Sequence, residues 1–116
     1  MCCFVDRNMK GGVKLSKEKS CNASVAIQVL PDVQGEEIIR VVDMVIDYIR
    51  STKMTYFVGP FETTIEGEYD DLMEIVKRCQ LICIEAGAPS VMSYVKIAYK
   101  PEGVWTIEKK VSKHRQ

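Results

Sequence analysis

The stretch GPFETTIEGE, residues 59–68, lies near the middle of the 116-residue chain and decides its fold. Its first two residues, Gly59 and Pro60, favour a reversal of the chain, because glycine tolerates unusual backbone angles and proline lacks a backbone donor. The residues after the reversal alternate between two faces, as in a short strand: Thr63, Ile65 and Gly67 against Thr64 and Glu66. The stretch therefore predicts a strand that carries a carboxylate on one face of its sheet.

A strand, a helix and a second strand are predicted before the reversal. Residues 24–31 alternate between apolar and small or polar side chains, which indicates a strand with two different faces. Gly35 opens a predicted helix that runs to about residue 50, and residues 54–58 form the next strand. The helix is amphipathic, with an apolar side of Ile38, Val42, Val45, Ile46 and Ile49 and a charged side of Glu36, Arg40, Asp43, Asp47 and Arg50.

The same order of elements is predicted after the reversal. Residues 61–67 form a strand, and Asp70 and Asp71 favour the start of a helix that stops at Gly87. Residues 91–97 alternate as a last strand, and Thr106 caps a short final helix that carries Ile107 and Val111. The second helix has one apolar stripe, made of Leu72, Ile75, Val76, Cys79, Cys83 and Ala86.

Two halves of the same pattern indicate a split pair of βαβ units. Right-handed crossovers then give a four-stranded antiparallel sheet with both helices on one face, the ferredoxin-like βαββαβ arrangement of the α+β class. The short C-terminal helix follows the sheet. Residues 1–22 lack a sustained period and contain Gly11-Gly12 and several lysines, so we expect a flexible arm before a single domain at residues 23–116.

Composition excludes several classes of partner. Sixteen basic and sixteen acidic side chains are interspersed, so no field favours nucleic acid or an anionic membrane, and no apolar run is long enough to span a bilayer. An odd number of irregularly spaced cysteines without a secretory leader predicts a reduced, cytoplasmic protein.

The second face of the expected sheet is left without a helix. By parity it carries Ser24, Ala26, Gln28, Thr64, Glu66, Met92, Tyr94 and Lys96. Because half of this face is apolar, we expect a second copy to cover it, as a homodimer or a dimer of dimers. A buried Glu66 would then need a partner. That partner is either Lys96 or a small polar or cationic ligand held between the sheets.

Three segments, ASVAIQVLP at residues 23–31, TTIEGE at 63–68 and YVKIAYK at 94–100, resemble the thiamine- and hydroxymethylpyrimidine-binding protein family over about residues 23–113. The resemblance implies a non-catalytic protein that binds thiamine or its hydroxymethylpyrimidine part near a subunit interface. It implies no catalytic residue, and no metal or other cofactor.

Side-chain chemistry gives candidate roles toward such a ligand. Glu66 would accept from the amino group or neutralise the cation, while Gln28, Ser24, Thr63 and Thr64 offer neutral donors and acceptors. An aromatic ring, Tyr56, Phe57 or Tyr94, would stack on the ligand, and parity alone does not choose among them. Lys96, the alternative partner of Glu66, is the last of the candidate ligand-binding residues.

Other functions have less support in the sequence. The single histidine, His114, lies in the charged tail and no phosphate-binding glycine loop is present, so an enzyme is disfavoured. Cys79 and Cys83 fall on an apolar stripe and are read as core residues, and an RNA-binding sheet would display aromatics where Glu66 stands. The alternative that stays open is a structural or regulatory homo-oligomer that senses another metabolite, such as an amino acid.

Overall fold

Six elements alternate in the order strand, helix, strand, strand, helix, strand. The computed structural model describes residues 21–104 and residue 107. Its elements are β1 (Ala23–Pro31), α1 (Glu36–Ser51), β2 (Thr55–Val58), β3 (Thr63–Gly67), α2 (Tyr69–Glu85) and β4 (Val91–Tyr99). The predicted βαββαβ order is confirmed. The predicted C-terminal helix, with Thr106 and Val111, lies outside the described residues apart from Ile107, and so does nearly all of the N-terminal arm.

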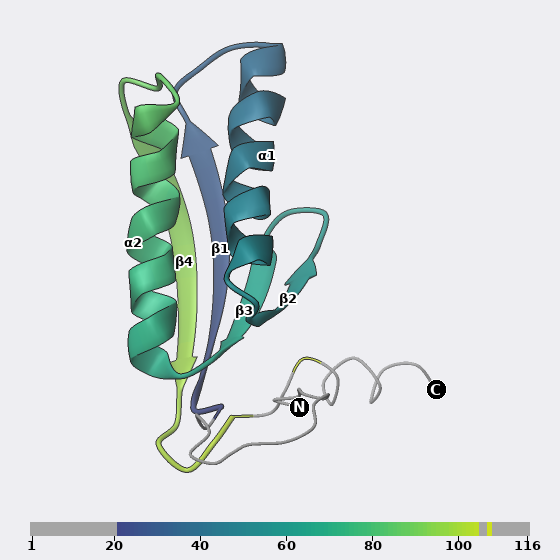
Figure 1. The fold of residues 1–116 in the computed structure, drawn as a ribbon, viewed down its shortest axis with the longest axis vertical. Helices are drawn as coiled ribbons and strands as arrows, with labels where there is room; N and C mark the ends of the chain where they lie inside the picture. Colours follow the sequence, from purple (N-terminus) through teal and green to yellow (C-terminus); the bar gives the residue numbers. More distant parts are fainter. Residues whose placement is uncertain (1–20, 105–106, 108–116) are drawn as a thin grey trace.

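The strands form one antiparallel sheet in the order β2-β3-β1-β4. Both helices pack against the same face of this sheet, and the two long strands β1 and β4 run side by side behind them (Figure 1). β1 pairs with β4 over its whole length but with β3 only from Ala23 to Ile27. The ferredoxin-like α+β fold is therefore confirmed, with a sheet that is wider at one end than at the other.

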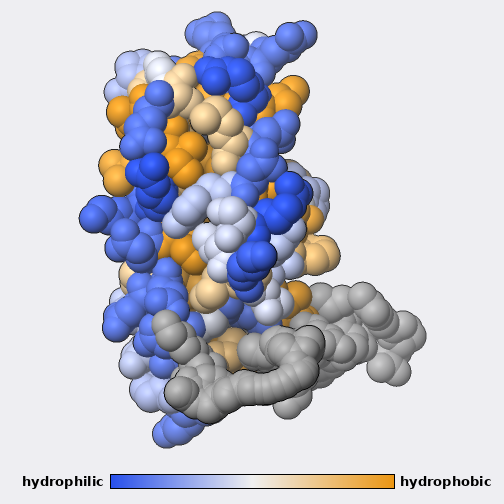
Figure 2. Space-filling view, viewed as in Figure 1, coloured by the Kyte–Doolittle hydropathy of each residue, from blue (hydrophilic) through white to orange (hydrophobic). Residues whose placement is uncertain are grey.

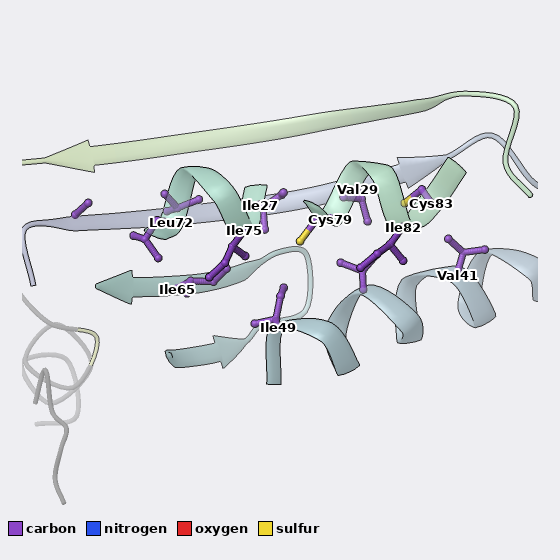
Figure 3. Packing of buried hydrophobic residues seen from close by; sticks show 13 residues of the cluster. Ile27, Val29, Val41, Ile49, Ile65, Leu72, Ile75, Cys79, Ile82 and Cys83 are labelled. Atoms are coloured by element: carbon purple, nitrogen blue, oxygen red, sulfur yellow. The ribbon is translucent and has the colours of Figure 1, made fainter. Parts of the chain in front are cut away.

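The core lies between the helices and the sheet, where alternate residues of β1 meet apolar residues of both helices (Figure 3). Val25 and Ile65 are fully buried on the sheet side, and Leu72 and Cys79 on the side of α2. On α1 the buried residues are Val41, Val45 and Ile49. Val41 was missing from the predicted stripe, while Ile38, which belonged to it, is 42% exposed. The face of α1 toward the sheet therefore carries residues spaced four apart, Val41, Val45 and Ile49.

Local backbone chemistry explains where the elements end. Gly59 N–H donates to the carbonyl of Glu62 over 2.9 Å, so the reversal extends to residue 62 and β3 begins two residues later than predicted. The Glu68 side chain accepts from Asp71 N–H at the start of α2. Gly87 follows α2 with φ +113, which an L side chain rarely adopts.

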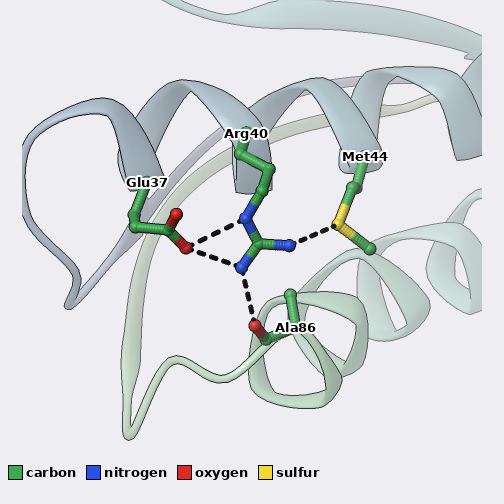
Figure 4. Close-up of polar contacts among 4 residues, drawn as sticks. All are labelled: Glu37, Arg40, Met44 and Ala86. Carbon is green, nitrogen blue, oxygen red and sulfur yellow. Dashed lines mark hydrogen bonds and ion pairs between the residues drawn. The ribbon is translucent and has the colours of Figure 1, made fainter.

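A single arginine joins the two helices at one end. The Arg40 guanidinium donates to Glu37 on its own helix and, over 2.9 Å, to the carbonyl of Ala86 at the end of α2 (Figure 4). Elsewhere hydrophilic side chains cover much of the side seen in Figure 2, with hydrophobic residues between them. Arg40 therefore supplies a cation at the C-terminal end of α2, where it donates to the Ala86 carbonyl.

Candidate functional site

Cross-strand partners place most of the predicted site residues on the face of the sheet opposite the helices. Ser24 stands opposite Glu66, Gln28 opposite Tyr94, and Ala26 has Thr64 on one side and Lys96 on the other. Because paired residues project from the same face, these side chains share one surface. We call it the open face and define it by Ser24, Ala26, Gln28, Leu30, Phe57, Thr64, Glu66, Met92, Tyr94, Lys96 and Ala98.

Thr63 does not belong to this surface. It pairs with Ile27 and Val58 and is 7% exposed on the helix side of the sheet. It lines a separate hollow of about 260 Å³ between α1, the end of β1 and the reversal, and Gln28 borders that hollow as well. Of the predicted hydrogen-bonding residues, Ser24 and Thr64 therefore lie on the open face and Thr63 lies in the separate hollow.

Of the two adjacent aromatic candidates, Tyr56 and Phe57, only Phe57 lies on the open face, which Tyr94 also shares. Phe57 pairs with Thr64, and its ring is half exposed. Tyr56 pairs with Ile65 on the other face, and its hydroxyl accepts from Arg50 Nε of α1 over 3.2 Å. Among the two adjacent candidates, the register thus assigns Phe57 to the open face and Tyr56 to the helix side.

A groove of about 330 Å³ opens on this surface. Its floor consists of small side chains, Ser24, Ala26 and Ala98, and larger ones border it, including Phe57, Lys96 and Ile107. The groove exists because Ser24, Ala26 and Ala98 have short side chains. Its size matches the lower end of typical small-molecule sites. Tyr94 lies one row beyond the groove and is 59% exposed.

Glu66 is buried beside this groove. It is only 2% exposed, and its Oε1 accepts a hydrogen bond from the backbone N–H of Ile107 over 2.6 Å. The contact joins residues 41 positions apart and brings Ile107 to the wide end of the open face. A short bond from an N–H to a carboxylate is charge-assisted and offsets part of the cost of burying the acid.

Lys96 makes a different ion pair from the one considered in the sequence. Its Nζ lies 3.2 Å from Oε2 of Glu62, just before β3. The side chain of Lys96 is 73% exposed and that of Glu62 is 35% exposed. The pair therefore joins β4 to the residue before β3 across β1, and only its Lys96 end borders the groove; water screens this exposed pair.

The far end of the open face keeps a large apolar surface. Met92 and Tyr94 are each 59% exposed, and Leu30, the partner of Met92, is 41% exposed. This cluster lies away from Ile107, on the long strands beyond the end of β3. Exposed apolar clusters of this kind commonly mark contacts with another protein or a ligand.

The cysteines of α2 are core residues. Cys79 and Cys83 are fully buried, and burial, aided by the neighbouring Cys83 thiol, raises the pKa of Cys79 to about 12. Both therefore stay protonated and unreactive at neutral pH. Within residues 21–104 and 107, no three His, Cys, Asp or Glu side chains come together in a way that could hold a metal ion. Neither α1 nor α2 has the length and apolarity needed to cross a bilayer.

Fold and surface define a class: a small ferredoxin-like domain with a ligand-sized groove on the sheet face opposite its two helices. The sequence profile of the thiamine-binding protein family matches residues 25–115, and the chain belongs to that family. It is 54% identical to a UPF0045 protein of Clostridium perfringens strain 13 over 96 residues, which are 83% of this chain and 98% of the relative.

Two solved structures share the fold and a substantial part of the sequence. A domain of unknown function, DUF77, from Bacillus cereus is 38% identical with a TM-score of 0.76, over 84% of this chain and 93% of that one. A Thermotoga maritima protein described as a candidate for thiamine biosynthesis or salvage is 39% identical with a TM-score of 0.73, over 81% of this chain and 99% of that one.

Proposed function

We propose that the protein binds thiamine, or its hydroxymethylpyrimidine part, in the groove of the open face and does not change it chemically. The observation that carries the proposal is the exposed ring of Phe57 beside the Thr64 side chain, over a floor of small residues, in a member of the thiamine-binding family. A flat ring needs such a floor, because larger side chains would prevent it from lying against the sheet.

The chemistry of the groove suits this ligand. The aminopyrimidine edge both donates and accepts hydrogen bonds, and the hydroxyls of Ser24 and Thr64 can do either. The face of Phe57 attracts a flat or cationic ring, a contact worth about 0.5 to 2 kcal/mol. Glu66 adds a negative charge beside the groove and acts through its field in this conformation, since Ile107 covers it.

A second copy of the chain completes the proposed site. The apolar cluster of Leu30, Met92 and Tyr94 continues the open face beyond the groove. Burying one large side chain contributes roughly 1.5 to 3 kcal/mol, so two such faces gain by meeting. Tyr94 and Gln28 would then border the ligand from the interface. We expect a homodimer or a dimer of dimers in the cytoplasm.

The second candidate function is a regulatory homo-oligomer that senses an amino acid. The Lys96–Glu62 pair favours it, because an ammonium and a carboxylate 3.2 Å apart match the two charges of a zwitterion. The two functions predict different ligands for the same groove.

Titration calorimetry on protein freed of ligand by unfolding and refolding separates these functions. Thiamine, hydroxymethylpyrimidine and a panel of amino acids are the ligands to compare. We expect heat with thiamine or its pyrimidine, and heat only with an amino acid would support the second candidate instead. A monomer at micromolar concentration in light scattering would contradict the interfacial site.

Two exposed phenylalanines allow a matched comparison. Phe57→Ala removes the ring from the groove and should weaken thiamine binding by about 2- to 30-fold, the equivalent of the stacking energy. Phe61→Ala removes a ring that is 78% exposed in the reversal and lies outside the groove lining, so its affinity should equal that of the parent. Equal losses in both variants would place the ligand elsewhere.

A further inference from the structure

The sheet leaves one side of α1 without a strand beneath it. β3 begins at Thr63, opposite Ile27, so within the described chain residues 28–31 of β1 have β4 on one side and no strand on the other. Figure 1 shows β1 extending past the hairpin of β2 and β3. The hollow of about 260 Å³ beside this free edge lies between α1, the end of β1 and the reversal at residues 58–62, and we call it the edge hollow.

The lining of the edge hollow is almost wholly apolar. Ile38 on α1, Leu30 on β1 and Val58 on β2 all line it and remain exposed. Val42 and Ile46 of α1 line it too and are partly buried. Large apolar side chains that stay exposed around one concavity are typical of a binding site. An engineered apolar cavity of about 150 Å³ takes up benzene, so the edge hollow has room for a ring of that size.

Thr63 brings a hydroxyl to this apolar lining. The residue is only 7% exposed, and its hydroxyl forms no hydrogen bond with any residue that the structure describes. A buried hydroxyl without a hydrogen bond costs free energy, and a ligand that bonds to it removes this cost. Because a hydroxyl both donates and accepts, either a hydroxyl or a carbonyl group of a ligand would suit it.

The charge in the edge hollow is already balanced. Glu62 is the one ionisable side chain among the described residues that line it, and its Oε2 lies 3.2 Å from Nζ of Lys96 on β4. A charged ligand would have to leave water for an apolar lining in which the described residues leave no charge unbalanced. A neutral ligand avoids that cost.

We propose that the edge hollow is a second ligand site, which takes a small neutral molecule with an apolar ring or branched chain and one hydroxyl or carbonyl group. The apolar part lies against α1 and the end of β1, and the polar group bonds to the hydroxyl of Thr63. Thr63 and Thr64 are neighbours on β3 but line different spaces, the edge hollow and the groove of the open face. The second site is therefore separate from the groove and does not depend on the function proposed for it.

Para-cresol, toluene and benzoate test the proposal on the full chain. They share one ring, but para-cresol carries a neutral hydroxyl, toluene no polar group and benzoate a charge. Titration of isotope-labelled protein, followed by NMR, reports where each of them binds. We expect para-cresol and toluene to shift the signals of Leu30, Ile38 and Val42, and benzoate at the same concentration to leave them in place.

Two results of this titration would overturn the proposal. Shifts confined to Ala26 and Ala98 would place the ring in the groove of the open face. The absence of shifts at Leu30, Ile38 and Val42 would show that the edge hollow takes no such molecule, as when a second copy or a strand of another protein fills it.

Thr63→Val removes the hydroxyl and keeps the shape of the side chain. Since this hydroxyl has no partner in the described chain, the variant should fold like the parent and bind toluene equally well. Its affinity for para-cresol should fall about fivefold, because the hydroxyl of the ligand then lacks a partner. Thr55→Val makes the same change on β2, lines neither space, and should leave both affinities unchanged. Equal changes of the two affinities in Thr63→Val, or a loss of para-cresol binding in Thr55→Val, would overturn the proposal.

A second variant fills the edge hollow. Ile38→Trp enlarges an exposed side chain of the lining, so it should abolish the binding of both molecules without disturbing the core. Circular dichroism checks the fold of each variant. Binding to folded Ile38→Trp with the affinity of the parent would show that the ring lies elsewhere and would overturn the proposal.

Discussion

Glu66→Gln tests whether the buried carboxylate holds Ile107 against the sheet. The substitution keeps the shape of the side chain and an acceptor for Ile107 N–H, but it removes the charge from a bond of 2.6 Å. Hydrogen bonds to charged groups contribute about 1.5 to 3 kcal/mol and neutral ones about 0.5 to 1.5. We therefore expect Glu66→Gln to lower the free energy of unfolding by about 1 to 2 kcal/mol.

The assay compares two variants that make the same chemical change on the same face. Glu62→Gln breaks an ion pair in which Lys96 is 73% exposed, and such pairs contribute about 0 to 1 kcal/mol. Urea unfolding followed by circular dichroism gives both free energies, and hydrogen exchange reports the amide of Ile107. Faster exchange at Ile107 only in Glu66→Gln is the expected result. Equal destabilisation and unchanged exchange at Ile107 would refute the reasoning.

Three further changes test the core, the thiols and the contact between the helices. Leu72→Ala should cost about 3 kcal/mol in urea unfolding, because Leu72 is fully buried, and a cost below 1 kcal/mol would contradict that packing. Cys79 and Cys83 should resist iodoacetamide at pH 8 until urea is added. Burial raises the pKa of Cys79 above its usual 9.0 to about 12, so the free energy of unfolding should be unaffected below pH 9 and fall from pH 9 to 12. The fall should be less steep in Cys79→Val. Equal slopes in the two proteins would exclude ionisation of Cys79 as the cause. Arg40→Leu should cost about 1 kcal/mol by loss of the bond to Ala86, and an unaltered urea midpoint would show that the bond contributes nothing.

The elements of the fold were predictable because their signals are local. The alternation in residues 24–31 and 63–67 fixed which residues share a face, and the register of β1 with β3 agrees with it. The predicted stripe of α1 was right at Val45 and Ile49 but included Val42 and missed Val41, since these two residues are adjacent and both apolar. Only packing against the sheet decides between them, and it buries Val41.

The partners of the charged groups were not predictable. Glu66 bonds to a residue 41 positions away, and Lys96 reaches Glu62 across an intervening strand. Periodicity tells which face a side chain occupies, but it carries no information on what lies over that face. Tyr56 and Phe57 illustrate the same limit, because two adjacent aromatic residues in a four-residue strand fit either parity until the register is known.

The contact of Arg40 with α2 has a consequence for how the domain forms. α2 has acidic residues in its first turn but no basic residue in its last, so among the described residues it is Arg40 of α1 that brings a cation to its C-terminal end. A peptide of α2 alone would lack this cation and fray at its C-terminal end. The two helices consequently reach their full stability only as a docked pair, which couples their formation into one cooperative step.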